Sequence, residues 1–166
     1  SVRAKERQKD EMGTLGSGNH YLEVQRVAVV YEPLTAEAFG LREGDVVLTI
    51  HCGSRGLGHQ IGTEALKAMA RSAPGHGITL PDRQLCCAPV DSPEGRHYVA
   101  AMSAAANYAW ANRQIIMELA RRSILHVLRI KPEELQARLL YDVCHNIAKM
   151  ETHEVEGASR RLCVHR

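Results

Sequence analysis

The feature that most constrains the fold is an apolar run that leads directly into a glycine-rich segment. Residues 46–50 are apolar or β-branched, which predicts a buried strand. Three glycines, two histidines and one arginine occur in the nine residues that follow, His51-Cys52-Gly53-Ser54-Arg55-Gly56-Leu57-Gly58-His59. A helix is predicted over about 60–71. The chain must therefore turn from a strand into a helix here, and the strand delivers His51 to that turn.

The chemistry of this segment admits two interpretations. Imidazole binds borderline metal ions. Backbone N–H groups in a glycine-rich turn bind anions, and the Arg55 guanidinium can grip a phosphate with two parallel hydrogen bonds. A metal ligand beside an anion-binding loop suits phosphoryl chemistry. The alternative is a tight turn that carries two surface histidines.

Composition limits the class of protein. The 166 residues suffice for one domain with a core. The net charge of +2 argues against histone-like binding of nucleic acid but leaves room for a local basic groove. The five cysteines are odd in number and form no CxxC pair, which favours a reducing compartment over a disulfide framework. No membrane span is predicted, and the charged N-terminal segment does not have the pattern of a secretory signal, so we expect a cytoplasmic protein.

The remaining pattern predicts a mixed α+β fold. Strands are expected near residues 21–27, 46–50, 139–144 and 161–165, in sheets covered by helices near 60–71 and 94–128. A short helix is expected between Thr35 as its N-cap and Gly40 at its end. Residues 72–93 contain four of the six prolines, which predicts a long loop.

Three histidines share one setting, the boundary between a loop and a strand: His20, His51 and His145. If the strands before His51 and His145 join one sheet, these two side chains converge on one edge. Alternation along a strand puts His20 and Glu23 on opposite faces, so both can face one ligand only if the chain bulges or is still a loop at His20. No local metal motif is present, and a hydrogen-bonded structural role for each histidine is the alternative.

Neither glycine-rich loop has a nucleotide-binding fingerprint. The pattern GxGxxG does not occur, and neither does GxxxxGK[ST]. Both the Rossmann and the P-loop interpretations are therefore rejected, and any nucleotide must be held in another way.

Taken together, the motifs resemble the signatures of the RtcB-type RNA-splicing ligases, in order and in approximate spacing. The resemblance rests on Gly13-Thr14-Leu15-Gly16-Ser17-Gly18-Asn19-His20-Tyr21-Leu22-Glu23, on His51-x-Gly53-Ser54-Arg55-Gly56-x-Gly58-His59, on Glu94-Gly95 with Tyr98, Met102, Ala104-Ala105-Ala106-Asn107-Tyr108-Ala109 and Asn112-Arg113, on Asp142-x-x-His145-Asn146 with Lys149 and Glu151, and on the closing Val164-His165-Arg166. It covers essentially the whole chain.

The resemblance implies an enzyme that joins RNA 3′-phosphate or 2′,3′-cyclic phosphate ends to 5′-hydroxyl ends, in tRNA splicing or RNA repair. It implies GTP and two Mn²⁺ ions as cofactors and a covalently guanylylated histidine. The implied partners are RNA with these ends, such as tRNA halves or broken RNA, and an activating protein is a further candidate.

The resemblance also assigns site residues. It implies that His20, His51 and His145 are metal ligands. Asn19, His20, Glu23 and Asn146 would line the GTP or GMP site, and Arg55 and Asn19 would bind the RNA-end phosphate.

Two parts of the family pattern are missing from this sequence. The upstream Asp and Cys ligands are expected before residue 1, and the guanylylated histidine is expected beyond residue 166, so no catalytic nucleophile is assigned here. Residues 1–166 are expected to be the central part of a single catalytic domain, and ligation is expected of the whole protein. The alternatives are a metal-dependent phosphoesterase built on the same histidines and a non-catalytic RNA-binding piece of a larger assembly.

Overall fold

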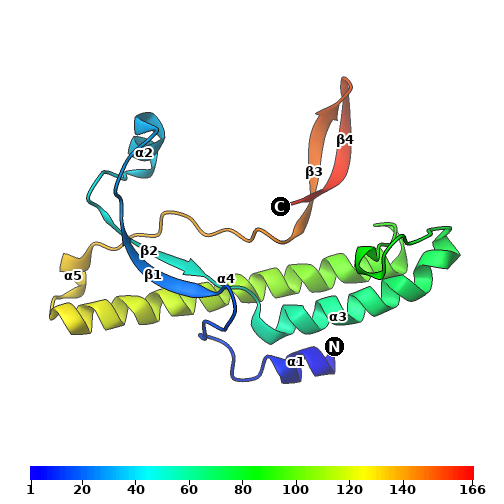
Figure 1. Cartoon of the computed structure of the whole chain (residues 1–166), viewed down its shortest axis with the longest axis horizontal. Coiled ribbons are helices and arrows are strands. Elements are labelled where there is room, and N and C mark those ends of the chain that lie inside the picture. Colours follow the sequence, from blue (N-terminus) through cyan, green and yellow to red (C-terminus); the bar gives the residue numbers. More distant parts are fainter. The chain divides into compact units, whose positions relative to one another are not determined.

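The computed structural model describes all 166 residues and confirms a mixed α+β fold (Figure 1). In chain order the elements are α1 (Val2–Arg7), β1 (Tyr21–Arg26), α2 (Pro33–Phe39), β2 (Val46–His51), α3 (Arg55–Ser72), the 3₁₀ helices η1 (Ala73–His76) and η2 (Arg83–Leu85), α4 (Pro93–Leu128), α5 (Pro132–Leu135), β3 (Ala148–Val155) and β4 (Ala158–His165). No helix combines the length and the apolar character that crossing a membrane requires.

The chain divides into two compact units. The first consists of Ser1–Met12, Ser54–Ala111 and Val143–Arg166, and the second consists of Gly13–Gly53 and Asn112–Asp142. The long helix α4 contributes its first part to one unit and its last part to the other. The two units are described separately below.

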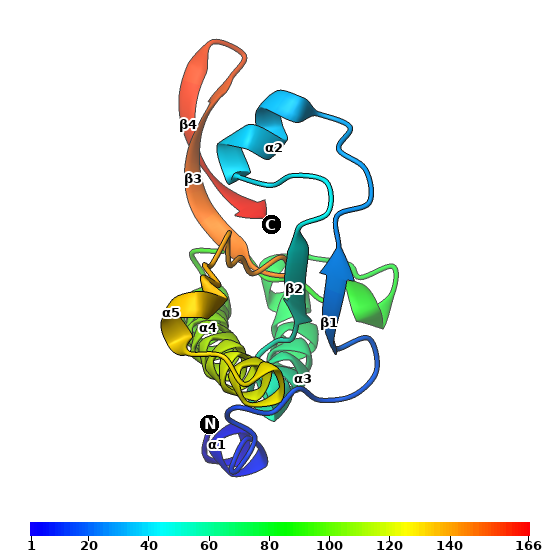
Figure 2. The same ribbon diagram turned by 90° about the vertical axis from the view of Figure 1, so that its left-hand side faces the viewer.

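In the first unit, α3 and the first part of α4 run antiparallel, and α1 packs on α3 (Figures 1 and 2). Small residues allow the close approach, since a Cβ added at Gly58 would lie 3.6 Å from the Cβ of Ala105. Met102, Ala105 and Ala109 are buried on α4. The predicted helices near 60–71 and 94–128 are both confirmed, and α3 begins earlier, at Arg55.

The first unit also contains the β3–β4 hairpin, whose antiparallel register pairs Ala148 with His165. Its two-residue turn has positive φ at both Glu156 (52°) and Gly157 (75°), as a type I′ turn requires. The strand near 161–165 is confirmed, and its partner at 148–155 was not predicted. The predicted strand at 139–144 is wrong: this segment pairs with no strand, because an apolar run does not by itself supply a partner.

In the second unit, β1 and β2 form an antiparallel hairpin, and α2 lies in the connection between them (Figure 2). The helix α2 ends at Gly40, which has a φ of 67°, as predicted. Thr35 is not its N-cap. The helix begins at Pro33 instead, because the fixed φ of proline and its missing N–H suit the first helical position.

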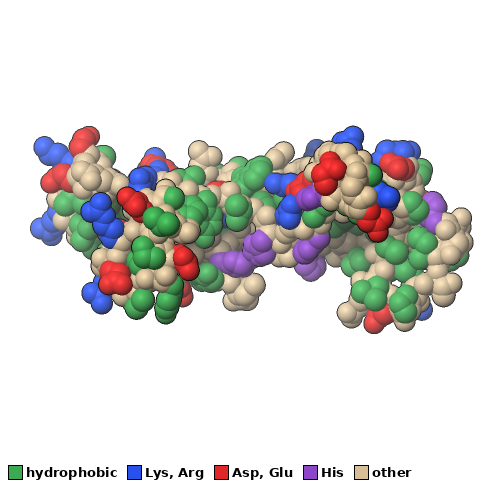
Figure 3. All heavy atoms as spheres, turned by 90° about the horizontal axis from the view of Figure 1, so that it is seen from above, with side chains coloured by type: hydrophobic (Ala, Val, Ile, Leu, Met, Phe, Trp, Pro, Cys, Tyr) green, Lys and Arg blue, Asp and Glu red, His purple; other side chains and the backbone are tan.

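The strands form two separate two-stranded sheets. All six residues of β1 are exposed, including Val24 at 65%, so the expected cover of helices is not found there. No strand precedes His145, so the expected route by which one sheet edge would bring His51 and His145 together does not apply. Basic and acidic side chains are interspersed over the face shown in Figure 3, in keeping with the small net charge.

Candidate functional site

The register of the β1–β2 hairpin brings two of the predicted metal ligands together. Tyr21 pairs with His51 at the end of the ladder, so His20 lies at the same end of the hairpin. The ring centroids of His20 and His51 are 6.0 Å apart, and the ring of Tyr21 stacks on that of His51 at 5.4 Å. Because β1 begins at Tyr21, His20 still belongs to the loop, which frees it from the alternation of the strand.

The imidazole of His20 has an unused nitrogen. Its Nδ1 is buried and has no hydrogen-bond partner. A Cβ at Gly53 would lie 4.0 Å from Nε2 of the same ring, so the glycine leaves room beside it. A buried polar atom without a partner is costly, and a neutral imidazole nitrogen is a common ligand of divalent metals. The chemistry of this nitrogen and of the neighbouring imidazole of His51 therefore suits a metal ion.

The structure assigns the third histidine to the other unit. His145 and Asn146 lie in a bend before β3. On one side of them the Cys144 thiol lies 3.9 Å from the carbonyl oxygen of Ala106, and on the other the Ala148 N–H lies 3.2 Å from the sulfur of Met102. The backbone around His145 therefore packs along the first part of α4. No group of three or more His, Cys, Asp or Glu side chains is arranged to hold a metal ion.

Two of the other predicted nucleotide ligands, Asn19 and Glu23, lie close to His20 in the sequence. Asn19 lies in the turn before β1 and is exposed. Glu23 lies in β1, is exposed, and accepts a hydrogen bond from Nε2 of Gln25 at 2.8 Å. Both residues are therefore exposed to solvent.

The predicted phosphate-binding segment already binds a carboxylate. The N–H of Gly56, in the first turn of α3, donates to Oε2 of Glu11 at 2.7 Å, and Arg55 forms an ion pair with Oε1 at 3.8 Å. A negative group at a helix N-terminus is stabilised by the helix dipole. Only glycine suits position 56, since a Cβ would lie 2.8 Å from the carbonyl oxygen of Arg7. The sequence analysis missed Glu11, because one acid in a charged segment carries no distinguishing pattern.

The sequence matches the family model described as tRNA-splicing ligase RtcB over residues 1–166. The chain belongs to the RtcB family. It is 52% identical to the tRNA-splicing ligase RtcB of Archaeoglobus fulgidus over 166 residues, which is all of this chain and 34% of that protein. It is 51% identical over its whole length to the tRNA-splicing ligase RtcB of Methanocaldococcus jannaschii, covering 17% of it, and 51% identical to the RNA-splicing ligase RtcB of Mycobacterium tuberculosis, covering 37% of it. The chain thus spans between about a sixth and about a third of these relatives.

Family membership confirms the resemblance carried by the sequence motifs. Within this RtcB-family chain, the structure brings together His20 and His51, with Glu23 on β1 and Asn19 in the turn before it. It assigns Arg55, His145 and Asn146 to the other unit. The roles of all these residues as ligands of metal, GTP or RNA stay predictions.

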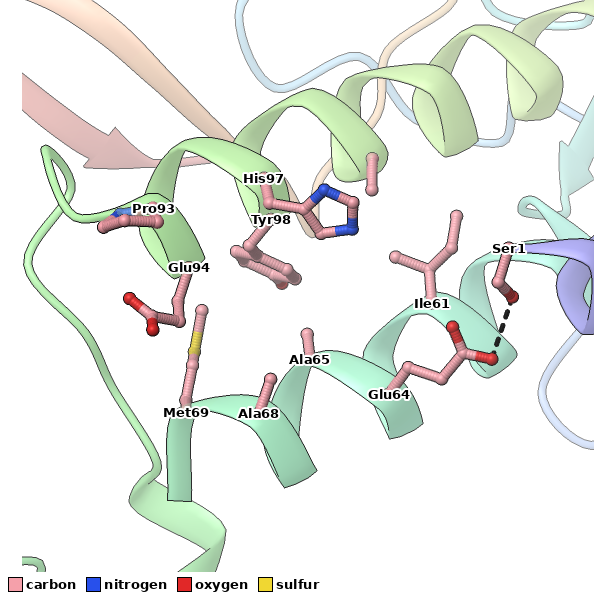
Figure 4. Close-up of a pocket in the computed structure, with 11 residues that line it drawn as sticks. Ser1, Ile61, Glu64, Ala65, Ala68, Met69, Pro93, Glu94, His97 and Tyr98 are labelled. Atoms are coloured by element: carbon pink, nitrogen blue, oxygen red, sulfur yellow. Dashed lines mark hydrogen bonds between the residues drawn. The ribbon is translucent and has the colours of Figure 1, made fainter. Parts of the chain in front are cut away.

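A separate cavity of about 370 Å³ lies in the first unit between α3 and the start of α4 (Figure 4). It is lined by Ser1, Ile61, Glu64, Ala65, Ala68, Met69, Pro93, Glu94, His97, Tyr98 and Ala101. Hydrogen bonds from Gln60 and Ser1 lower the pKa of Glu64, and a backbone N–H and His76 lower the pKa of Glu94. None of the predicted site residues lines this cavity, so it is not part of the predicted site.

Proposed function

We propose that this chain supplies part of the catalytic centre of an RNA ligase that joins 3′-phosphate or 2′,3′-cyclic phosphate ends to 5′-hydroxyl ends, in tRNA splicing or RNA repair. Membership of the family supports the reaction class, and the relatives quoted above are named as tRNA-splicing or RNA-splicing ligases. The observation that carries the proposal is the pair of imidazoles at the end of the β1–β2 hairpin.

The proposed metal is Mn²⁺, in two ions, with His20, His51 and His145 among the ligands. The buried and unpartnered Nδ1 of His20 supports a ligand at this position, as does the nearby ring of His51. When bound, divalent cations would neutralise phosphate charge and align the reacting groups. The support for His145 as a ligand is its place in the motif Asp142-x-x-His145-Asn146.

The proposed nucleotide is GTP, lined by Asn19, His20, Glu23 and Asn146. A histidine outside this chain would attack the α-phosphorus through its ring nitrogen and release pyrophosphate, since neutral imidazole is a competent nucleophile. GMP would then pass to the RNA 3′-phosphate, and the 5′-hydroxyl would displace GMP as the new phosphodiester forms. The residues of this chain would bind and orient the reactants in each step.

Arg55 is the proposed ligand of the RNA-end phosphate, together with Asn19. The surroundings of Arg55 support this role, because the first turn of α3 already binds a carboxylate through the N–H of Gly56 and the Arg55 guanidinium. A phosphate offers the same kind of acceptor with more charge, and a guanidinium can bind it with two parallel hydrogen bonds.

The test is RNA joining by the whole protein with GTP, Mn²⁺ and RNA that carries 3′-phosphate and 5′-hydroxyl ends. Joined RNA is expected, and both His20→Ala and His51→Ala should reduce the yield by at least about a hundredfold. The matched control is His126→Ala, which removes an exposed histidine of α4 and should leave joining unchanged. Release of phosphate without GTP would point to a phosphoesterase instead. RNA binding that ignores Mn²⁺ and His51→Ala would point to a non-catalytic role.

A further inference from the structure

We propose that Asn112 and Arg113 of α4 are positioning residues that fix the distance between the loop carrying His20 and the turn carrying His51. The inference rests on the proposed function, because it concerns two of the proposed metal ligands. All the contacts that carry it lie within the second unit.

The side chain of Asn112 is fully buried and binds both segments. Its Oδ1 accepts a hydrogen bond from the N–H of Gly13 at 2.6 Å, and its Nδ2 donates to the carbonyl oxygen of Thr14 at 3.1 Å. The same Nδ2 lies 3.2 Å from the sulfur of Cys52 and 3.4 Å from the carbonyl oxygen of Gly53. The amide group of Asn112 thus forms hydrogen bonds to the loop before His20 and to the turn after His51.

Arg113, the next residue of α4, also forms a hydrogen bond to the turn that follows His51. Its Nη1 donates to the carbonyl oxygen of Cys52 at 3.0 Å, and its Nε donates to Oδ1 of Asp142 at 2.6 Å. The residue is only 9% exposed, so the paired carboxylate offsets the cost of burying the charge. Because Cys52 directly follows His51, this hydrogen bond fixes the backbone at the proposed ligand.

The two segments are also joined to each other and to α4. The Cys52 thiol donates to the carbonyl oxygen of Leu15 at 2.9 Å. Gly13 has a φ of 78°, and a Cβ there would lie 2.9 Å from Cγ2 of Ile115, one turn along α4. The loop therefore lies directly on the helix, and two segments distant in sequence meet at one turn of α4.

A positioning role follows from how these hydrogen bonds are distributed. Both polar groups are buried and bind the backbone just after His51, and Asn112 also binds Gly13 and Thr14 at the start of the loop that carries His20. Removing either group would leave backbone donors or acceptors without a partner inside the unit, and the segments would shift to satisfy them. The separation of the His20 and His51 rings is therefore set by α4 as well as by the strand register.

The first test measures how fast the Cys52 thiol reacts in the absence of metal. In the metal-free whole protein, Asn112→Ala should raise the rate at which the Cys52 thiol reacts with a maleimide by at least about tenfold, mapped by peptide mass. The matched control is Ile116→Ala, which removes a buried apolar side chain one turn along the same helix and no hydrogen bond to either segment. Its labelling rate at Cys52 should stay close to that of the unmodified protein. Unchanged labelling in Asn112→Ala, or equal rises in both variants, would overturn the proposal.

The second test measures Mn²⁺ affinity by calorimetric titration. Asn112→Ala and Arg113→Lys should weaken binding by about tenfold or more, which is the range for residues that orient metal ligands, while Ile116→Ala leaves it unchanged at a comparable loss of Tm. Lysine is expected to fail at position 113 because one ammonium cannot reproduce the two directed hydrogen bonds. The positioning role would be contradicted if the Mn²⁺ affinity of all three variants fell only in proportion to their Tm. If the unmodified protein binds no Mn²⁺, the proposed function fails, and the thiol measurement still decides whether Asn112 holds the turn.

Discussion

The side chain of Glu11 joins the N-terminal segment to the start of α3. Its carboxylate accepts the N–H of Gly56 and pairs with Arg55, so it stabilises the first turn of the helix. Such a carboxylate is stabilising because the exposed N–H groups at a helix start carry partial positive charge.

The variant Glu11→Gln keeps an oxygen acceptor but removes the charge. We expect it to lower the free energy of unfolding by about 0.5–1 kcal/mol, measured by urea denaturation, because the interaction with the dipole and with Arg55 is lost. Glu6→Gln, on the exposed face of α1, is the matched control and should be close to neutral. Equal effects in the two variants would show that Glu11 does not stabilise the helix start.

Gly13 and Gly18, in the loop before β1, allow the cost of a left-handed backbone to be measured separately from the cost of overpacking. Gly13 and Gly18 have nearly the same φ, 78° and 74°, but a Cβ at Gly13 would meet Ile115 at 2.9 Å whereas nothing lies within 4 Å at Gly18. Alanine at either position should cost about 1–2 kcal/mol for the left-handed backbone. At Gly13 the contact should add roughly 1–3 kcal/mol for overpacking. Thermal unfolding of both variants tests this, and Gly13→Ala is expected to have the lower Tm.

At the scale of elements, the β3–β4 hairpin carries a pH-dependent contact. Hydrogen bonds from Arg166 and then from His153 lower the pKa of Glu151 below its ordinary value of 4.5. In the unfolded chain this carboxylate takes up its proton at a higher pH than in the folded hairpin. Its contribution to stability is therefore fully present above pH 4.5 and is lost as the pH falls through the lower, folded pKa.

We expect Glu151→Gln to remove this part of the pH dependence. The difference in unfolding free energy between the unmodified protein and the variant should shrink as the pH is lowered below 4.5, measured by denaturant titration at several pH values. Glu154→Gln on the same strand is the control, since no ion pair is formed by Glu154. A difference that stays constant down to acid pH would contradict the assignment.

Helices with a long apolar periodicity were predicted correctly from the sequence. Strands were predicted poorly where their formation depends on pairing with another segment. The helix expected over 94–128 is observed over Pro93–Leu128, because its apolar periodicity extends over many turns. The apolar run at 139–144 forms no strand, and the less apolar segment at 148–155 forms one because β4 lies opposite it. A strand forms only where a second segment pairs with it, so the pattern of one segment alone does not predict it.

The same distinction applies to the candidate site. The motifs identified His20 and His51 separately, and both flanking strands were predicted. Their proximity follows from the pairing of Tyr21 with His51, which no motif specifies. Asn112 and Arg113 belong to a recognised motif, but their contacts with the two loops depend on how the loops fold onto α4.

At the scale of the whole molecule, the chain folds as two compact units and spans about a third of the Archaeoglobus and Mycobacterium relatives. Of the three proposed metal ligands, His20 and His51 belong to one unit and His145 to the other. The proposed nucleophile lies outside residues 1–166. We therefore expect the proposed reaction only of the whole protein, and the central claim has to be tested there.

The most direct test is the intact mass of the whole protein after incubation with GTP and Mn²⁺. We expect one covalent GMP per molecule, attached to a histidine outside residues 1–166, formed only when Mn²⁺ is present and lost in His51→Ala. The control His126→Ala should form the adduct normally. Absence of any adduct, or an adduct that forms equally without Mn²⁺ or in His51→Ala, would contradict the proposed ligase chemistry and the role of the histidine pair.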